Sequence, residues 1–445
     1  MLKKVRIKNF KSFKDVEIEF NNLNVLVGAN ASGKTNFLAY LEFMKEIVHK
    51  DKQPDLSRAI INQCGIAGVN YFLNTNIGTQ EPFETEIVCI NQIGTRVGKT
   101  KERIVIYPNE EIYKLNLIFN EGKINYEIIK EELTWKCGLD KAVDLEDEIY
   151  FDPKSLNQRT IILKFNDKNW EYYELMPDGK LEATQILQPL RDHHAHWDKL
   201  VSSEKLDSIN NKISTSHQHK ILLEGQGLFV SDLKEILRSI SSFDIKPECK
   251  NPLLPMTNYE PLKKDGSNLI LVLAYLLKDE EKKRTLFNLM TYVFPFFKEL
   301  EIREVFENYI QLWMKEKYHK EAWIPSFLIS DGTINIIAFL IALFFDDSKI
   351  VFIEEPDRYL HPYLISALVE LLKEASEKKQ IIITTHNPEI LRYVDKKDIL
   401  LVSRGDDGFS KISRPANKKI IQIFLTDELG MPELFIDNLL EMQDA

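Results

Sequence analysis

The chain has 445 residues, of which 44% are hydrophobic and 28% charged, and its formal net charge is −10. This length and composition predict a globular protein of two or three structural units and exclude wholesale disorder. Strong non-specific nucleic-acid binding depends on excess Lys and Arg, so DNA stays open as a partner but is not the default one. The four cysteines are scattered, and the longest apolar run, residues 334–345, falls short of the roughly 20 residues of a membrane span. We therefore expect a cytoplasmic protein with no membrane partner.

The first half of the chain has mainly the patterns of β-structure. Apolar and polar residues alternate over 1–20, which predicts a β-hairpin, and the continuous apolar segment 23–27 predicts a buried strand. Apolar residues then recur at helical spacing over 37–48, which predicts an amphipathic helix. Short alternating segments between 71 and 173, separated by Asn, Gly or Asp, predict an antiparallel β-section.

The second half has mainly helical patterns. They dominate between 184 and 318, and an apolar helix is predicted to start near Ile334. The apolar segments 349–353 and 380–385 predict two strands with a helix between them, and 395–412 predicts a last hairpin.

A glycine-bounded loop lies between the first buried strand and the following helix. Its sequence, GANASGKT, matches the pattern GxxxxGK[ST] without a gap. In this pattern backbone N–H groups surround phosphates, the lysine reaches the β- and γ-oxygens, and the last hydroxyl can ligate magnesium. The strand–loop–helix context favours this function over a chance glycine turn. The predicted nucleotide-binding residues of the loop are Gly28, Asn30, Ala31, Ser32, Gly33, Lys34, Thr35 and Asn36.

Polar side chains follow both of the later predicted strands. Glu354 and Glu355 end the first strand, and His386 follows the second. Strand ends in open α/β sheets face the ligand crevice, so we expect these side chains near the phosphate. Glu354 would hold magnesium through water, Glu355 would polarise the attacking water, and His386 would contact the γ-phosphate. The alternatives are an exposed acidic turn and a structural histidine.

The segment ISDGT directly precedes the apolar helix. Ser330 is a good helix N-cap, and Gly332 permits close backbone approach. One interpretation is a capped helix start, and the other is an anion-binding helix terminus.

Together these motifs resemble the RecF/SMC/OLD branch of ABC-type ATPases, AAA family ATPases of the AAA_21 type. The resemblance rests on IKNFKSF, GANASGKTN, SDGT, FIEEPDRYLHP and TTHNPEIL, in this order. It implies an α/β fold, namely an ABC-type P-loop NTPase head with a mixed sheet, an antiparallel β-lobe and a helical insertion. The implied cofactors are ATP and Mg²⁺. The domain boundaries that we expect are 1–180 for an N-terminal ATPase lobe, 181–320 for the helical insertion and 321–445 for a C-terminal lobe.

The resemblance also implies roles for single residues. Glu355, His386 and Lys34 would be catalytic, and Thr35 and Glu354 would hold the metal. Residues 356–361 would form the D-loop, and residues 11–13 would lie near the base or ribose. The signature motif, which would contact the nucleotide of a second copy, is implied to contain Ser330, Asp331, Gly332 and Thr333.

The sequence departs from this family pattern in several places. Glu354 stands where Asp is usual, and the Q-loop glutamine stays open among Gln63, Gln80 and Gln92. We expect no Toprim nuclease domain and no SMC-like coiled-coil arms. Two further segments receive a structural interpretation rather than a chemical one: the histidine-bearing stretch 191–219 is predicted to be a polar loop, and KKDGSN (263–268) a helix start.

These implications define the functional hypotheses. The first is an ATPase whose head-to-tail, ATP-dependent homodimer or higher oligomer regulates a separate effector, such as a nuclease or toxin, in bacterial anti-phage defence. The second is a RecF-like DNA repair or recombination ATPase that binds DNA. The third is a scaffold in which nucleotide holds an oligomer together.

Overall fold

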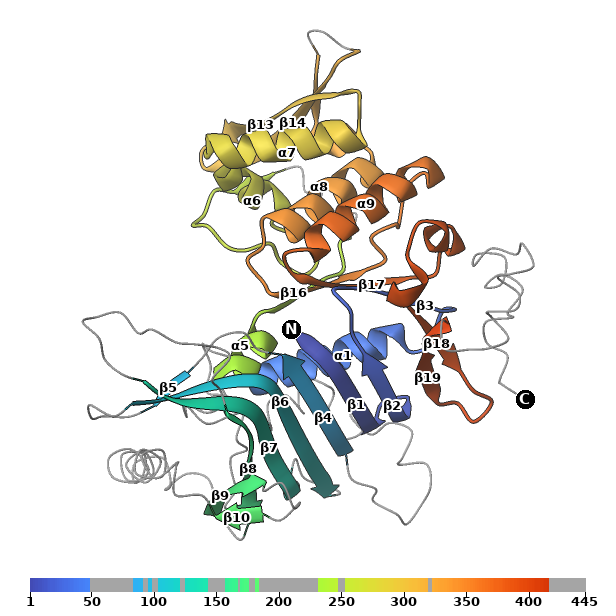
Figure 1. The fold of residues 1–445 in the computed structure, drawn as a ribbon. Helices are drawn as coiled ribbons and strands as arrows, with labels where there is room; N and C mark the ends of the chain where they lie inside the picture. The colour runs from blue at the N-terminus through green and yellow to red at the C-terminus, as the bar shows by residue number, and fades with distance from the viewer. Residues whose placement is uncertain are drawn as a thin grey trace. The chain divides into compact units, whose positions relative to one another are not determined.

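The computed structural model describes eleven stretches of the chain, and their contacts divide it into two units (Figure 1). Unit 1 contains 1–19 and 43–238, and unit 2 contains 20–42 and 239–445, so the division falls within helix α1 (Lys34–Ile47). Each unit is described by itself. The described residues are 1–48, 83–90, 95–97, 103–120, 125–142, 157–166, 169–175, 181–183, 231–246, 253–318 and 322–415.

Unit 1 is built on a nine-stranded antiparallel sheet with the strand order β10-β9-β8-β7-β6-β4-β1-β2, and β5 pairs with β6 (Figure 1). This confirms the predicted hairpin and the predicted antiparallel section. Among its described residues are helix α5 (Ser231–Arg238) and the second half of α1. The strands are β1 (Leu2–Phe10), β2 (Phe13–Glu19), β4 (Phe83–Ile90), β5 (Thr95–Val97), β6 (Arg103–Asn120), β7 (Asn125–Ala142), β8 (Asn157–Asn166), β9 (Asn169–Leu175) and β10 (Leu181–Ala183).

One face of this sheet is apolar because β1 and β2 bury alternate residues, as a strand with one buried face must. Three aromatic rings lie together there: Phe10, Phe43 and Phe83 have centroids 5.7 to 6.0 Å apart. Phe43 belongs to the second half of α1, so this half of the helix packs into the core of unit 1.

Unit 2 is built on a six-stranded sheet in which the order β11-β16-β17-β3-β18 is parallel and β19 pairs antiparallel with β18. The sheet is therefore mixed, as predicted. The carboxyl ends of parallel strands lie at the same edge of a sheet, so the residues that follow β3, β16 and β17 lie close together at that edge. The strands are β3 (Leu23–Val27), β11 (Ile240–Phe243), β16 (Ile350–Glu354), β17 (Gln380–Thr385), β18 (Ile399–Arg404) and β19 (Ser410–Ser413).

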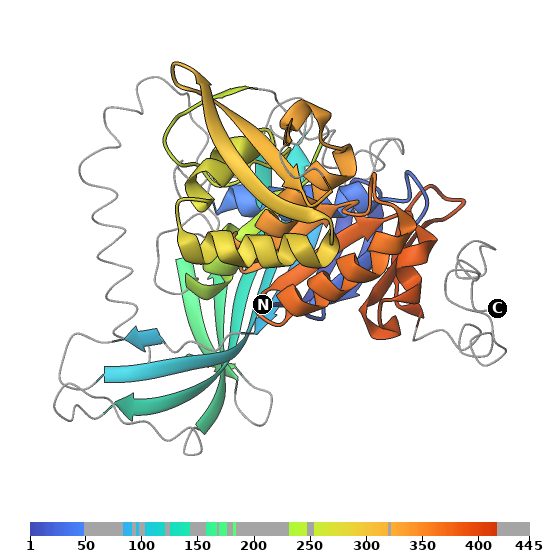
Figure 2. The same ribbon diagram turned by 90° about the horizontal axis from the view of Figure 1, so that it is seen from above.

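The described residues of unit 2 also contain four complete helices, the first half of α1 and a second sheet. Helix α9 packs against β17 and β3, and α8 packs against α7 and α9. Helix α7 also packs against β13, and Figure 2 shows this yellow helix beside the yellow-orange hairpin. The helices are α6 (Leu269–Leu276), α7 (Glu280–Val293), α8 (Asp331–Phe344) and α9 (Ile365–Ser376). The second sheet contains β12 (Leu254–Pro255), β13 (Phe297–Phe306), β14 (Tyr309–Glu316) and β15 (Trp323–Pro325), and the short 3₁₀ turns are η4 (Ser326–Leu328), η5 (Pro362–Leu364), η6 (Pro388–Arg392) and η7 (Lys396–Asp398).

The segment expected to be a helical insertion, 181–320, is not helical throughout. Its described residues contain α5, α6 and α7 but also strands β10 to β14, and β11 belongs to the six-stranded sheet. The contacts divide the chain after residues 19, 42 and 238, whereas the boundaries expected at 180 and 320 stay a prediction.

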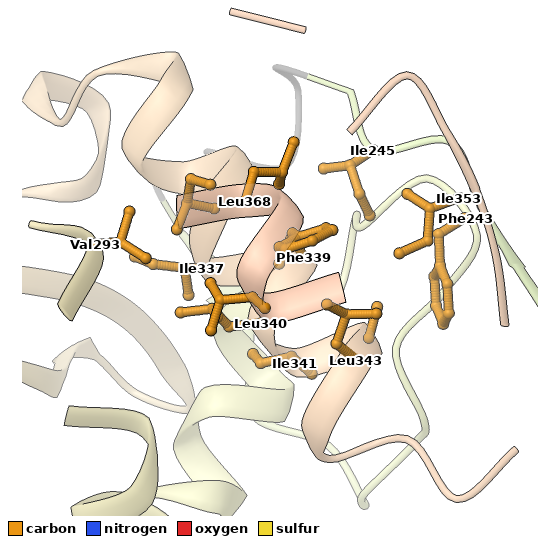
Figure 3. Packing of buried hydrophobic residues seen from close by; sticks show 14 of the residues in the cluster. Phe243, Ile245, Val293, Ile337, Phe339, Leu340, Ile341, Leu343, Ile353 and Leu368 are labelled. Atoms are coloured by element: carbon orange, nitrogen blue, oxygen red, sulfur yellow. The ribbon is translucent and has the colours of Figure 1, made fainter. Parts of the chain in front are cut away.

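Helix α8 is the centre of the core of unit 2. Its residues from Thr333 to Leu343 are all buried, which fits a helix that is apolar on every side. Figure 3 shows Ile337, Leu340 and Ile341 of this helix among side chains from α7 and α9, with Phe243 and Ile353 on the sheet beside them. This packing holds the N-terminus of α8 at a defined place. None of the helices in the described ranges is both long and apolar enough to cross a membrane.

Candidate nucleotide-binding site

The phosphate loop connects β3 to α1, as predicted, and its backbone is unusual. Ala31 and Gly33 have φ angles of 64° and 118°, in the left-handed region that favours glycine. Gly28 lies so close to β18 that a Cβ atom there would be 2.1 Å from the carbonyl oxygen of Val402. The loop is also tied to β19, because Oγ of Ser410 donates to the carbonyl oxygen of Ser32 at 2.6 Å.

Lys34 is folded into this loop and is only 7% exposed. Its Nζ donates to the carbonyl oxygens of Gly28 at 2.7 Å and Ala29 at 2.8 Å. Burial lowers the pKa of Lys34, although Glu355 and Glu354 act in the opposite direction. Oγ of Ser32 is buried and makes no hydrogen bond within the described part of the chain. A buried ammonium and a hydroxyl with no hydrogen-bond partner among the described residues, both in a glycine-bounded loop, fit a phosphate ligand.

Two side-chain oxygens that could hold a metal lie beside the loop. Oγ1 of Thr35, in the first turn of α1, donates to Oε2 of Glu354 at 3.5 Å, and Glu354 ends β16. Burial raises the pKa of Glu354, and the charge of Asp244 adds to this effect. Magnesium prefers oxygen ligands and binds through one or two carboxylates together with substrate phosphates and waters, so this donor set fits Mg²⁺. Within the described ranges, no group of three or more His, Cys, Asp or Glu side chains could hold a metal by itself.

Glu355 has hydrogen-bond donors on both carboxylate oxygens. Nδ1 of His386 donates to Oε1 at 2.9 Å, while Nε and Nη2 of Arg358 donate to Oε2 at 3.1 and 2.9 Å. Burial favours the neutral carboxyl, but the hydrogen bonds from Arg358 and His386 outweigh it and lower the pKa of Glu355. Glu355 also has a φ of 43°, a strained conformation for a residue with a side chain. The structure thus brings Glu355 and His386 together at one end of the sheet.

The SDGT segment begins α8, three residues earlier than the sequence pattern predicted. Oγ of Ser330 accepts from the N–H of Thr333 at 3.1 Å, which confirms the predicted N-cap. Gly332 makes the predicted close approach: a Cβ atom there would lie 2.7 Å from the carbonyl oxygen of Tyr359. The N-terminus of α8 therefore lies against Tyr359, in the segment 356–361 that was predicted to be the D-loop.

Three residues that the sequence did not indicate, namely Asp244, Lys264 and Glu42, lie near enough to Glu354 for their charges to act on it. Asp244 directly follows β11, and Lys264 pairs with Glu42 of α1, which also accepts from Ser242 at 2.8 Å. Both Lys264 and Arg358 lower the pKa of Glu354. Lys264 belongs to the KKDGSN segment, which ends at Asn268, the residue directly before α6, so the predicted helix start is confirmed. Only the parallel pairing of β11 with β16 could have indicated Asp244.

Other predicted residues lie elsewhere. Lys11 to Phe13 connect β1 and β2 in unit 1, and Phe13 is fully buried, so their role near a base or ribose stays a prediction. The glutamine candidates Gln63, Gln80 and Gln92 and the histidine-bearing stretch 191–219 lie outside the described residues.

A phosphate loop after β3, acidic residues after β16 and a histidine after β17, with the capped α8 in the same unit, define an ABC-type P-loop ATPase head. Comparison with protein families gives the same class. The family described as "AAA domain, putative AbiEii toxin, Type IV TA system" matches residues 23–179 and 263–392, more than half of the chain. The chain belongs to this family and to the RecF/SMC/OLD branch of ABC-type ATPases.

The chain is also similar to individual proteins. It is 43% identical to the DNA replication and repair protein RecF of Lactococcus lactis over 181 residues, 38% of this chain and 48% of that protein. It is 21% identical to the Retron Ec83 probable ATPase of Escherichia coli over 90% of this chain and 71% of that protein. A solved SMC head bound to the C-winged helix domain of ScpA shares 14% identity and a TM-score of 0.41, covering 93% of this chain and 97% of that one. The match to this RecF thus spans about half of its length.

Proposed function

We propose that the chain binds ATP with Mg²⁺ at residues 28–36 and hydrolyses it. The observation that carries this proposal is the convergence of Lys34, Thr35, Glu354 and Glu355 in one unit, with the Thr35 hydroxyl 3.5 Å from the Glu354 carboxylate. Family membership supports the same activity. Bound magnesium would neutralise charge on the phosphates and orient them.

Each side chain has a proposed part in this reaction. Lys34 would leave the carbonyl oxygens of its own loop for the β- and γ-phosphate oxygens, which are stronger acceptors because they are charged. Thr35 and Glu354 would hold the metal. Glu355 would accept a proton from the attacking water. His386, which in this structure donates a hydrogen bond from Nδ1 to Glu355, would contact the γ-phosphate.

We further propose that ATP-bound copies dimerise head to tail through their nucleotide sites. The N-terminus of α8 carries a positive dipole end and the cap Ser330, and the cap residue is exposed. The neighbouring turn exposes Phe327 and Leu328 by 54% and 68%, which supports burial against another surface. Ser330, Asp331, Gly332 and Thr333 of one copy would then close the nucleotide site of the other.

The dimer would regulate a separate effector protein, such as a nuclease or toxin, in bacterial anti-phage defence. The family description names a toxin–antitoxin system, in which two proteins act together, and this supports a functional partner for the chain. The net charge of −10 supports a protein partner over nucleic acid. Co-purification with a small protein effector, dependent on ATP, tests this part of the proposal.

A RecF-like DNA repair ATPase is the second candidate. Identities of 43% and 41% to RecF proteins of Lactococcus lactis support it. Salt-dependent binding of the isolated protein to plain duplex DNA would favour this candidate over the first, because phosphate contacts release counterions.

The test of the nucleotide site is the variant Lys34→Ala. It should abolish ATP binding, measured with a fluorescent ATP analogue, because it removes the ammonium from the phosphate loop. Lys378→Ala is a matched control, since Lys378 follows α9 and takes no part in the site. Undiminished ATP binding by Lys34→Ala would contradict the proposal.

A further inference from the structure

The guanidinium of Arg358 lies between two carboxylates that follow different strands. Its Nε and Nη2 donate to Oε2 of Glu355, and its Nη1 donates to Oδ1 of Asp244 at 3.3 Å. The three side chains are partly buried, with exposures of 33% for Arg358, 17% for Glu355 and 25% for Asp244. Charge-assisted bonds from a planar fork fix orientation as well as adding energy.

Orientation matters for a carboxylate that activates water. A glutamate side chain has three rotatable bonds, and catalytic groups need placement within about 0.5 Å of the productive geometry. Arg358 donates two hydrogen bonds to Oε2 of Glu355, and His386 donates one to Oε1 of the same carboxylate. The rotation of the Glu355 carboxylate is therefore set by its neighbours rather than by its own torsions.

The backbone around Arg358 is held by two further elements. Nδ2 of Asn335, on the buried helix α8, donates to the carbonyl oxygens of Pro356 at 3.3 Å and Arg358 at 3.0 Å. Oγ1 of Thr385, at the end of β17, donates to Oδ2 of Asp357 at 3.0 Å. These bonds hold the backbone from which the Arg358 side chain extends, and the hydrogen bond to Asp244 holds its guanidinium.

We infer that Asp244, Arg358 and Glu355 form a positioning relay, in which Asp244 orients Arg358 and Arg358 orients the water-activating carboxylate. This inference rests on the proposed function, because it assumes that Glu355 activates water. Asp244 occupies the strand end beside Glu354, since Phe243 of β11 pairs with Ile353 of β16. Within the relay, Arg358 and Asp244 are positioning residues and touch no reacting atom.

A direct action of Asp244 on the metal is the rival explanation. Asp244 is near enough to Glu354 for its charge to act on that carboxyl, and Lys264 and Glu42 lie in the same neighbourhood. The two explanations differ in one respect: a relay residue acts only while Arg358 is present, whereas a metal-site residue acts in any background.

A double-mutant cycle on full-length protein separates them. The variants are Asp244→Asn, Arg358→Ala and their combination, with Arg358→Lys as the conservative replacement. The measurements are kcat, KM for ATP and the Mg²⁺ concentration for half-maximal turnover. Arg358→Ala should lower kcat by about 10- to 100-fold, the scale of a misplaced catalytic group, with KM changed less than about twofold. Arg358→Lys should restore part of the loss, since it keeps the charge but not the fork.

The decisive result concerns Asp244. Asp244→Asn should lower kcat in the wild-type background and have no further effect in the Arg358→Ala background. An equal loss in both backgrounds, or a shifted Mg²⁺ dependence that persists without Arg358, would overturn the relay. Wild-type kcat in Arg358→Ala would overturn it as well.

Two controls keep failures distinguishable. Arg303→Lys, on β13 and paired with Glu301, should keep wild-type turnover, and unfolding midpoints exclude variants that fold poorly. A wild-type protein that binds ATP without hydrolysing it would overturn the proposed function and this inference together. If the wild-type protein hydrolyses ATP and the Asp244→Asn and Arg358→Ala variants keep its kcat, only the relay is overturned and the proposed function stands.

Discussion

The hydroxyl of Thr35 lies 3.5 Å from Oε2 of Glu354, although 319 positions separate the two residues along the chain. Parallel pairing of β3 with β17, and of β17 with β16, brings them together at one edge of the sheet. The two side chains proposed to hold magnesium come from distant parts of the sequence and therefore lie together within a single unit.

Replacing Thr35 with Ala should weaken the response of ATP binding to magnesium. The variant loses a hydroxyl ligand, so the Mg²⁺ concentration for half-maximal binding should rise on the order of 10-fold or more. A magnesium titration with a fluorescent ATP analogue measures this concentration. Chelation by EDTA should remove the magnesium-dependent ATP binding in both wild type and Thr35→Ala. Thr285→Ala in α7, where the hydroxyl donates to its own helix, is the matched control. An unchanged magnesium requirement would exclude Thr35 as a ligand.

Gly332→Ala should destabilise the protein, although Ala favours helix over Gly by up to about 1 kcal/mol. The added Cβ atom would lie 2.7 Å from the carbonyl oxygen of Tyr359, and this overpacking costs about 1–3 kcal/mol. Urea unfolding gives the free-energy difference. A more stable variant would show that α8 and the D-loop do not approach each other as described.

The Arg6–Asp15 pair on β1 and β2 should make unfolding depend on pH. Hydrogen bonds from Arg6, at 2.9 and 2.7 Å, hold the pKa of Asp15 below its ordinary value despite partial burial. A carboxyl with a lowered folded pKa stabilises the protein above its unfolded pKa of about 3.9, and this contribution is lost as the pH falls through the folded pKa.

Asp15→Asn should therefore lower the free energy of unfolding at pH 7 by up to about 1 kcal/mol, the range for exposed pairs. The difference from wild type should narrow below about pH 4. Arg6→Gln should give a loss of similar size at pH 7. A difference that stays constant down to low pH would rule out the pair as its cause.

Much of the site could be predicted from sequence because its parts are local. The phosphate loop, the Ser330 cap and the acidic end of β16 each depend on fewer than about ten neighbouring residues and on rules that act over one turn or one strand end. Their meeting at one sheet edge followed from the expected parallel pairing.

The positions of Asp244 and Lys264 could not be predicted in the same way. They depend on β11, whose four residues ISSF carry too little pattern to indicate either a strand or its partner β16. The hairpin of β13 and β14 was not predicted either, because the alternation of apolar and polar residues is broken where the pairing shifts register. The left-handed backbone at Glu355 and Tyr359 has no sequence signal at all, since neither residue is glycine.

In the proposed dimer a second copy closes the nucleotide site, and the variant Glu355→Gln provides the test. The variant keeps the side-chain size but cannot accept the proton of water, so it should bind ATP and stop before hydrolysis. Analytical ultracentrifugation with ATP and Mg²⁺ should then show the mass of two copies, and Ser330→Arg in the same background should return it to the mass of one. A Glu355→Gln protein that hydrolyses ATP at the wild-type rate would exclude Glu355 as the group that activates water, and one that stays a single copy with ATP bound would exclude the proposed dimer.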